Sequence, residues 1–470
     1  MDSSVGTRSD LTKRGKTRLT LTAERMGPAD ESGAPIRPQT PHRHTVLVTN
    51  GQVVGGTRGF LPAVEGMRAC AAVGVVVTHV AFQTGHSSGV GGRLFGRFDL
   101  AVAVFFAVSG FLLWRGHAAA ARDLRSHPRT GPYLRSRVAR IMPAYVVAVV
   151  VILSLLPDAD HASLTVWLAN LTLTQIYVPL TLTGGLTQMW SLSVEVAFYA
   201  ALPVLALLGR RIPVGARVPA IAALAALSWA WGWLPLDAGS GINPLTWPPA
   251  FFSWFAAGML LAEWAYSPVG LPHRWARRRV AMAVTALLGY LVAASPLAGP
   301  EGLVPGTAAQ FAVKTAMGSL VAFALVAPLV LDRPDTSHRL LGSPAMVTLG
   351  RWSYGLFIWH LAALAMVFPV IGAFPFTGRM PTVLVLTLIF GFAIAAVSYA
   401  LVESPCREAL RRWERRNEPI SVGELQADAI APRLGRLTPG GHLVDRARWH
   451  DPLTGLTGHG GDEIEVRVVM

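Results

Sequence analysis

The chain has 470 residues, of which 52% are hydrophobic and 14% are charged, with a formal net charge of +14 and a mean hydropathy of +0.43. So few charged residues cannot cover a soluble globule of this length, and the composition therefore indicates an integral membrane protein. The positive charge is dispersed between apolar blocks, which argues against a nucleic-acid-binding protein. The two cysteines, Cys70 and Cys406, provide neither a disulfide framework nor a metal-ligating motif, so we expect no metal site.

Both ends of the chain differ from its centre. Residues 1–60 are rich in Thr, Arg, Gly and Pro and show no sustained apolar period, so they are predicted to form a disordered cytoplasmic tail without a signal peptide. Residues 407–470 are predicted to begin as a basic amphipathic helix on the inner membrane surface and to continue as a polar tail. The intervening residues, 61–406, are expected to form one membrane domain.

This domain contains ten apolar blocks, each close to the roughly 20 residues that a membrane-spanning helix requires. The sequence therefore predicts an all-α, polytopic bundle of about ten transmembrane helices in the lipid bilayer. The blocks cover residues 63–82, 98–114, 141–156, 189–208, 214–234, 247–266, 280–298, 307–331, 350–371 and 381–402.

Arg residues divide the loops between the blocks into two sets. The loops after the second, fourth, sixth and eighth blocks carry seventeen Arg residues, whereas the opposite loops carry three, Arg93, Arg97 and Arg379. Because cytoplasmic loops are enriched in Arg and Lys, the Arg-rich set is predicted to face the cytoplasm. An even number of spans then puts both termini on the cytoplasmic side of the cell membrane.

Arg68 and His79 are two ionisable residues within the first block. They are eleven positions apart, so they share one helix face and differ by about 16 Å in depth. Ionisable side chains inside a membrane span are costly unless they face a cavity or a partner, which makes both residues candidates for a functional site. Arg68 is expected near the cytoplasmic surface and His79 near the outer one.

The first block and several later segments resemble the acyltransferase 3 family of integral membrane acyltransferases. The resemblance extends over roughly residues 62–406 and rests on motifs that occur in the family's order. These motifs are PAVEGMRACAAVGVVVTHV (62–80), FDLAVAVFFAVSGFLLW (98–114), YLRSRVARIMPAY (133–145), WSLSVEVAFYAALP (190–203), LGRWSYGLFIWH (349–360) and VESP (402–405).

This resemblance implies an enzyme that transfers an acyl group, usually acetyl, from cytoplasmic acyl-CoA to a hydroxyl group. The acceptor would be a cell-envelope glycan, a glycolipid or a secondary metabolite. Arg outnumbers Lys by 38 to 3, as expected of a GC-rich bacterial genome, and all three kinds of acceptor stay open.

If the protein is such an acyltransferase, the arginines on the cytoplasmic side are expected to bind the acyl-CoA donor. The residues nearer the outer surface are expected to take part in the transfer reaction. Arg68, Arg137 and Arg140 are candidate CoA-binding residues, because guanidinium groups bind phosphate oxygens in a forked geometry and CoA carries several phosphates. His79 is the candidate general base that removes the proton of the acceptor hydroxyl, and Glu195 is expected to orient it. The candidate substrate-contacting residues are Asp99, Ser109 and His360.

Each of these residues could instead have a purely structural role. Arg68 could be a snorkelling anchor at the interface, and Arg137 and Arg140 could simply mark a cytoplasmic loop. His79 and His360 could be core residues that form hydrogen bonds between helices. Asp99 could lie at the interface, Glu195 could form a structural ion pair, and Ser109 with Gly110 could allow close helix approach.

A second class of function fits the composition equally well. A multi-span transporter, or a flippase for lipids or glycans, would also bury charges in about ten spans without any acyl transfer. Transporters often contain an internal structural repeat, and the two halves of this chain show no convincing one.

Overall fold

The structure is a computed structural model, and the residues that it describes are 16–22, 43–49, 52–53 and 60–417, with gaps at 160, 237–238, 303, 305 and 333–337. The predictions for the two terminal tails therefore lie mostly outside the described residues. In the amino-terminal segment, three antiparallel strands pair in the order β1 (Lys16–Thr22), β2 (Arg43–Thr49) and β3 (Gln52–Val53).

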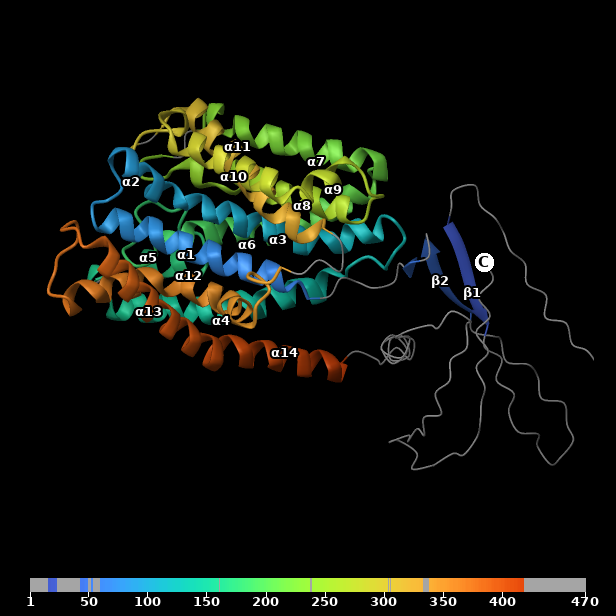
Figure 1. Cartoon of the computed structure of the whole chain (residues 1–470). Coiled ribbons are helices and arrows are strands. Elements are labelled where there is room, and N and C mark those ends of the chain that lie inside the picture. Colours follow the sequence, from blue (N-terminus) through green and yellow to red (C-terminus); the bar gives the residue numbers. More distant parts are fainter. Residues whose placement is uncertain are drawn as a thin grey trace, which may run out of the picture. The chain divides into compact units, whose positions relative to one another are not determined.

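From residue 60 onward the described chain is helical, as Figure 1 shows. Short turns of 3₁₀ helix connect several of the α-helices, and a π-helical turn, Tyr399–Glu403, joins the last two. The α-helices are α1 (Pro62–Gln83), α2 (Gly89–Gly96), α3 (Ala101–Ala120), α4 (Thr130–Leu155), α5 (Leu164–Leu171), α6 (Trp190–Arg210), α7 (Val214–Trp229), α8 (Phe252–Ala265), α9 (Leu271–Ala276), α10 (Arg279–Ala294), α11 (Ala308–Val330), α12 (Pro344–Val370), α13 (Met380–Ser398) and α14 (Ser404–Asn417).

All ten predicted apolar blocks contain a helix, so the prediction of an all-α polytopic fold is confirmed for the membrane domain. Eight helical segments of the described chain are long and apolar enough to cross a membrane. The two remaining blocks hold α8 and α10, which have 14 and 16 residues. A count of ten spans therefore depends on these two shorter helices.

The predicted start of the third block is wrong by about three turns. The apolar pattern begins at residue 141, but α4 already begins at Thr130. Its first turns are basic, and Arg is a good helix former that apolar periodicity does not detect. As a consequence, Arg137 and Arg140 lie on a helix, three positions apart and on one face, and not in a loop.

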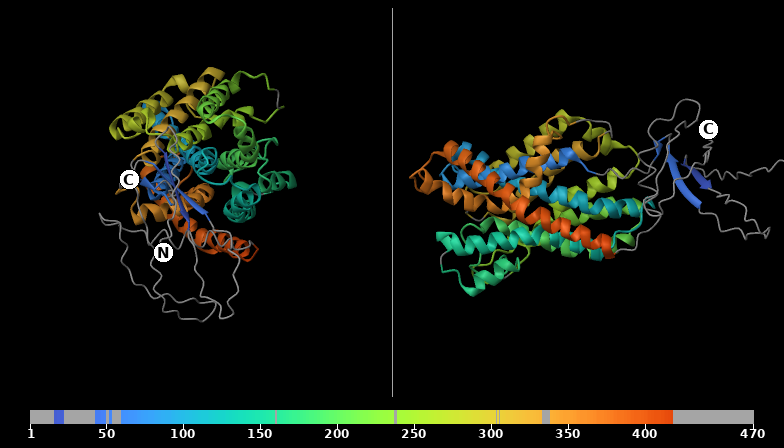
Figure 2. Two further views of the ribbon diagram at one scale, coloured as in Figure 1. Left: turned by 90° about the vertical axis from the view of Figure 1, so that its right-hand side faces the viewer. Right: turned by 90° about the horizontal axis from the view of Figure 1, so that it is seen from below.

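Helices α1 and α3 occupy the centre of the bundle. Helix α1 packs against α12 and α3, and α3 in turn packs against α8 and α11. Helices α7, α10 and α11 lie together on one side of the bundle, whereas α12 and α13 lie on the other, as two further views confirm (Figure 2). This arrangement places residues of α1, α3 and α12 deep inside the protein.

Glycines allow the central helices to approach closely. A Cβ atom added at Gly258 of α8 would lie 1.8 Å from the carbonyl oxygen of Ala107, and one at Gly110 of α3 would lie 2.1 Å from that of Phe255. A Cβ at Gly350 of α12 would similarly lie 2.1 Å from the carbonyl oxygen of Glu65 on α1. Small residues of this kind permit backbone contact between membrane helices, and here they fix how α3 meets α8 and how α1 meets α12.

One buried carboxylate connects α3, α7 and α8. Glu263 has no exposed surface, and its Oε1 accepts hydrogen bonds from Arg217 Nε at 2.7 Å and from Trp114 Nε1 at 2.8 Å. Its Oε2 accepts a hydrogen bond from Arg122 Nη1 at 2.7 Å. The carboxylate therefore compensates two arginines that would otherwise be buried without a countercharge.

Replacing Glu263 by Gln should destabilise the bundle by about 3 to 5 kcal/mol, because one partner of a buried charge network is lost while the arginines stay buried. Unfolding of the purified protein in detergent measures this change. The matched control is Glu408→Gln, which removes an exposed partner of Arg412 on α14 at 3.5 Å and should cost less than about 1 kcal/mol. Equal stability of the two variants would contradict the structural role of Glu263.

Candidate active site

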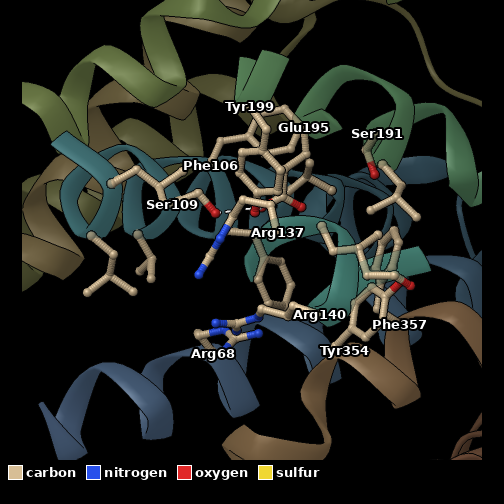
Figure 3. A pocket seen from close by; sticks show the side chains of 17 residues that line it. Arg68, Phe106, Ser109, Arg137, Arg140, Ser191, Glu195, Tyr199, Tyr354 and Phe357 are labelled. Carbon is tan, nitrogen blue, oxygen red and sulfur yellow. Dashed lines mark hydrogen bonds between the residues drawn. The ribbon is translucent and has the colours of Figure 1, made fainter. Parts of the chain in front are cut away.

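Five helices enclose a cavity of about 60 Å³ inside the bundle. Side chains of α1, α3, α4, α6 and α12 line it, and Figure 3 shows that three guanidinium groups point towards it. We call it the arginine cavity. Its charged and hydroxyl-bearing residues are Arg68, Ser109, Arg137, Arg140, Ser191, Glu195, Tyr199 and Tyr354.

The structure brings Arg68, Arg137 and Arg140 to this one cavity. Arg68 on α1 is 9% exposed and forms an ion pair of 3.1 Å with Glu65, one turn before it. Arg137 on α4 lies over the ring of Tyr199 at 6.0 Å from its centroid, and its buried Nε has no hydrogen-bond partner among the described residues. Cationic groups that converge in this way, with a donor left unpaired, form a site suited to a bound anion.

Glu195 lies in the same cavity, but its partners differ from the prediction. Its Oε1 accepts hydrogen bonds from Ser109 Oγ and Tyr199 Oη, each at 2.5 Å. The expected pairing with His79 does not form, because the face of α6 that carries Glu195 turns towards α3. Tyr199 follows Glu195 by four positions on one helix face, so helical spacing was a signal that could have identified this pair.

Ser109, a candidate substrate-contacting residue, lines the cavity, but its hydroxyl donates to Glu195, a partner that the sequence did not suggest. The prediction of close helix approach holds for Gly110, which meets α8, whereas Ser109 points towards Glu195. Another residue that sequence reasoning missed is Tyr354 on α12, which lines the cavity and donates a hydrogen bond to the carbonyl oxygen of Ile141 at 2.9 Å.

His79 lies beside His360, which approaches it from α12. The two rings meet edge to face with centroids 4.9 Å apart, and His79 Nδ1 lies 3.3 Å from His360 Nε2. His79 Nδ1 also lies 2.8 Å from the carbonyl oxygen of Val75, and His360 Nδ1 lies 2.7 Å from that of Phe357. These contacts hold both imidazoles in defined orientations.

The histidine pair is adjacent to the arginine cavity and does not line it. Phe357 and Phe105 both line the cavity, and their rings meet edge to face at 6.3 Å. The ring of Phe357 is also 6.1 Å from that of His360. Phe357 thus lies between His360 and the cavity, and Phe105 packs against Phe357.

Asp99, the remaining candidate, has a structural partner. Its Oδ2 forms an ion pair of 2.5 Å with Lys314 Nζ on α11, while its buried Oδ1 has no hydrogen-bond partner among the described residues. Asp99 does not line the arginine cavity. The structure therefore separates the eight predicted residues into a cavity group of five, a histidine pair and Asp99.

The fold and the cavity describe a polytopic helical membrane protein with a buried cationic site, and comparisons with known proteins agree with this class. A family model described as an acyltransferase domain matches residues 61–402. The chain belongs to this family, the acyltransferase 3 family, and it is a membrane acyltransferase that transfers groups other than amino-acyl groups.

A relative named as an acyltransferase supports this assignment. The chain is 28% identical over 410 residues to the acyltransferase MdmB of Streptomyces mycarofaciens, and the match covers 80% of this chain and 98% of that protein. No solved structure matches the chain. The family predicted from the sequence motifs is thus confirmed.

Proposed function

We propose that the protein transfers an acyl group from cytoplasmic acyl-CoA to a hydroxyl group of a cell-envelope glycan, a glycolipid or a secondary metabolite, and that this acyl group is acetyl. The observation that carries this proposal is the convergence of Arg68, Arg137 and Arg140 on one cavity. Arginine binds phosphate through two parallel charge-assisted hydrogen bonds, and CoA presents a 3′-phosphate and a diphosphate.

The size of the cavity limits which part of the donor enters it. At about 60 Å³ it is far smaller than the roughly 300 to 1,000 Å³ of sites that enclose a whole small molecule. We therefore propose that the arginines hold the phosphates at the cytoplasmic entrance, with adenosine outside. The pantetheine arm then extends past Phe105 and Phe357 towards the histidine pair.

His79 is the general base in this proposal. The acceptor hydroxyl gives its proton to the imidazole while its oxygen attacks the carbonyl carbon of the thioester. The carbon–sulfur bond then breaks, CoA leaves as a thiolate, and the imidazolium returns the proton to sulfur. Neutral imidazole suits this role because one ring nitrogen carries a lone pair that can take a proton while the other remains a hydrogen-bond donor.

The proposed orientation follows from the distribution of Arg in the loops. Both termini and the donor are assigned to the cytoplasm, and His79 to the outer half of the cell membrane. The protein would then move an acyl group outward without moving CoA. No feature of the cavity favours a transporter or flippase that catalyses no reaction, and membership in the acyltransferase family supports catalysis of acyl transfer.

Transfer in oriented membrane vesicles tests the proposal. Inside-out vesicles from cells that produce the protein, given radiolabelled acetyl-CoA outside, should accumulate label in an ester that hydroxylamine cleaves. Right-side-out vesicles should not, because acetyl-CoA does not cross the membrane. The control is vesicles from cells that lack the protein. If labelling were equal in that control, the activity would be refuted, and labelling confined to right-side-out vesicles would refute the orientation.

A further inference from the structure

We infer that His360 is a positioning residue that fixes the tautomer of His79 and supports its protonated form. The inference rests on the proposed function of His79 as the general base and adds a second residue to that function. The residues involved are His79, His360, and the carbonyl groups of Val75 and Phe357.

The hydrogen bonds of the pair define both tautomers. A carbonyl oxygen can only accept, so the ring nitrogen facing one must carry the hydrogen. His360 Nδ1 faces the carbonyl oxygen of Phe357 at 2.7 Å, and therefore His360 Nδ1 is the donor and His360 Nε2 is an acceptor. His79 Nδ1 faces the carbonyl oxygen of Val75 at 2.8 Å, and so it also carries a hydrogen.

These two assignments are consistent with each other. The hydrogen on His79 Nδ1 lies between two acceptors, the carbonyl oxygen of Val75 and His360 Nε2, the latter at 3.3 Å. The opposite nitrogen of His79, Nε2, is left with a free lone pair. This is the atom that a general base needs, because it can take a proton without breaking either hydrogen bond.

His360 also stabilises the positively charged form of His79 that exists after proton transfer. When Nε2 of His79 takes a proton, the Nδ1–H group becomes a stronger donor, and the lone pair of His360 Nε2 lies on the side where it can accept. Among the described residues, no carboxylate forms a hydrogen bond with His79. Glu195 accepts from Ser109 and Tyr199, and Asp99 is paired with Lys314.

The two histidines differ in exposure, and this difference assigns them different roles. His360 has no exposed surface, so it cannot contact an acceptor, whereas His79 is partly accessible. The close approach of α1 and α12 at Gly350 sets the spacing of the helices that carry the two rings. His360 therefore acts through His79, in the way that a third group orients the base of a catalytic triad.

Three variants of α12, assayed by acetyl transfer in inside-out vesicles, test this inference. His360→Leu keeps the volume but removes the acceptor and should lower kcat by roughly 100-fold, with KM for acetyl-CoA changed by less than about threefold. His360→Gln restores an acceptor near the position of Nε2, so its kcat should be at least about tenfold higher than that of His360→Leu. Leu364→Met, a volume-conserving change one turn later on α12, should keep kcat within about twofold.

The outcomes separate this inference from the proposed function. Loss of activity in His79→Ala together with full activity in His360→Leu would overturn the inference alone. Full activity in His79→Ala would overturn the proposed base and the inference together. A loss in His360→Leu that Gln does not restore, or a loss of CoA affinity in parallel, would mean that His360 is only a packing residue.

Discussion

Replacing His79 by Ala should lower the rate of acetyl transfer by about 10² to 10⁴-fold, because the acceptor hydroxyl loses the group that takes its proton. KM for acetyl-CoA should change little, since the phosphates of the donor are bound by arginines that His79 does not contact. The initial rate in inside-out vesicles, measured over a range of acetyl-CoA concentrations, gives both quantities.

A second histidine provides the control for this result. His86 lies beyond the end of α1, where its Nδ1 is 3.0 Å from the carbonyl oxygen of Thr84, and it has no role in the proposed chemistry. His86→Ala should keep the rate within about twofold of the unmodified protein, as most surface substitutions do. An active His79→Ala variant would remove His79 from the mechanism.

Replacing both Arg137 and Arg140 by Gln should weaken the binding of CoA by at least 100-fold. A hydrogen bond to a charged group is worth about 1.5 to 3 kcal/mol, which corresponds to roughly 10 to 100-fold in affinity for each arginine. The effect should fall on Kd for CoA and on KM for acetyl-CoA more than on kcat. Equilibrium binding of CoA to the purified protein measures it.

Arg135 on the same helix is the matched control. It does not line the cavity, so Arg135→Gln should change the affinity for CoA by less than about threefold. If Arg135→Gln weakened CoA binding as much as the double variant does, CoA would be attracted by the general positive potential of this surface and not by a specific site. If the double variant bound CoA with unchanged affinity, Arg137 and Arg140 would only mark the cytoplasmic side of the membrane.

The membrane fold was largely predictable, because apolar blocks of spanning length leave few possibilities besides a helical bundle. The start of α4 was not, since its first turns are basic and carry no apolar signal. The lengths of α8 and α10 were also missed, because Phe252–Ala265 and Arg279–Ala294 lie within longer apolar runs that include 3₁₀ turns.

The cavity was predictable only in part. Arg68, Arg137 and Arg140 could be grouped because each lies at the entrance of a span on the Arg-rich side, and the structure does bring them together. The hydrogen bond between Ser109 and Glu195 could not be predicted, since the direction in which a face of α6 points depends on packing against α3, whereas the spacing of Tyr199 from Glu195 was visible in the sequence. Hydropathy and loop charge carry no information about that packing.

The histidine pair shows the same limit more strongly. His79 and His360 are 281 positions apart, and the helices that carry them, α1 and α12, meet closely at Gly350. His360 was predicted to be either a substrate-contacting residue or a core residue with an interhelical hydrogen bond, and the structure encloses it fully beside His79. Tertiary packing, and not local sequence, decides which polar residue inside a membrane faces another.

A structure of the protein bound to an unreactive thioether analogue of acetyl-CoA tests the proposed roles of the arginines and of His79 most directly. We expect phosphate oxygens within about 3 Å of the guanidinium groups of Arg68, Arg137 and Arg140, with the pantetheine arm directed past Phe357 and the acetyl group next to His79. An analogue whose phosphates bind away from these arginines, or whose acetyl group lies remote from His79, would contradict these roles.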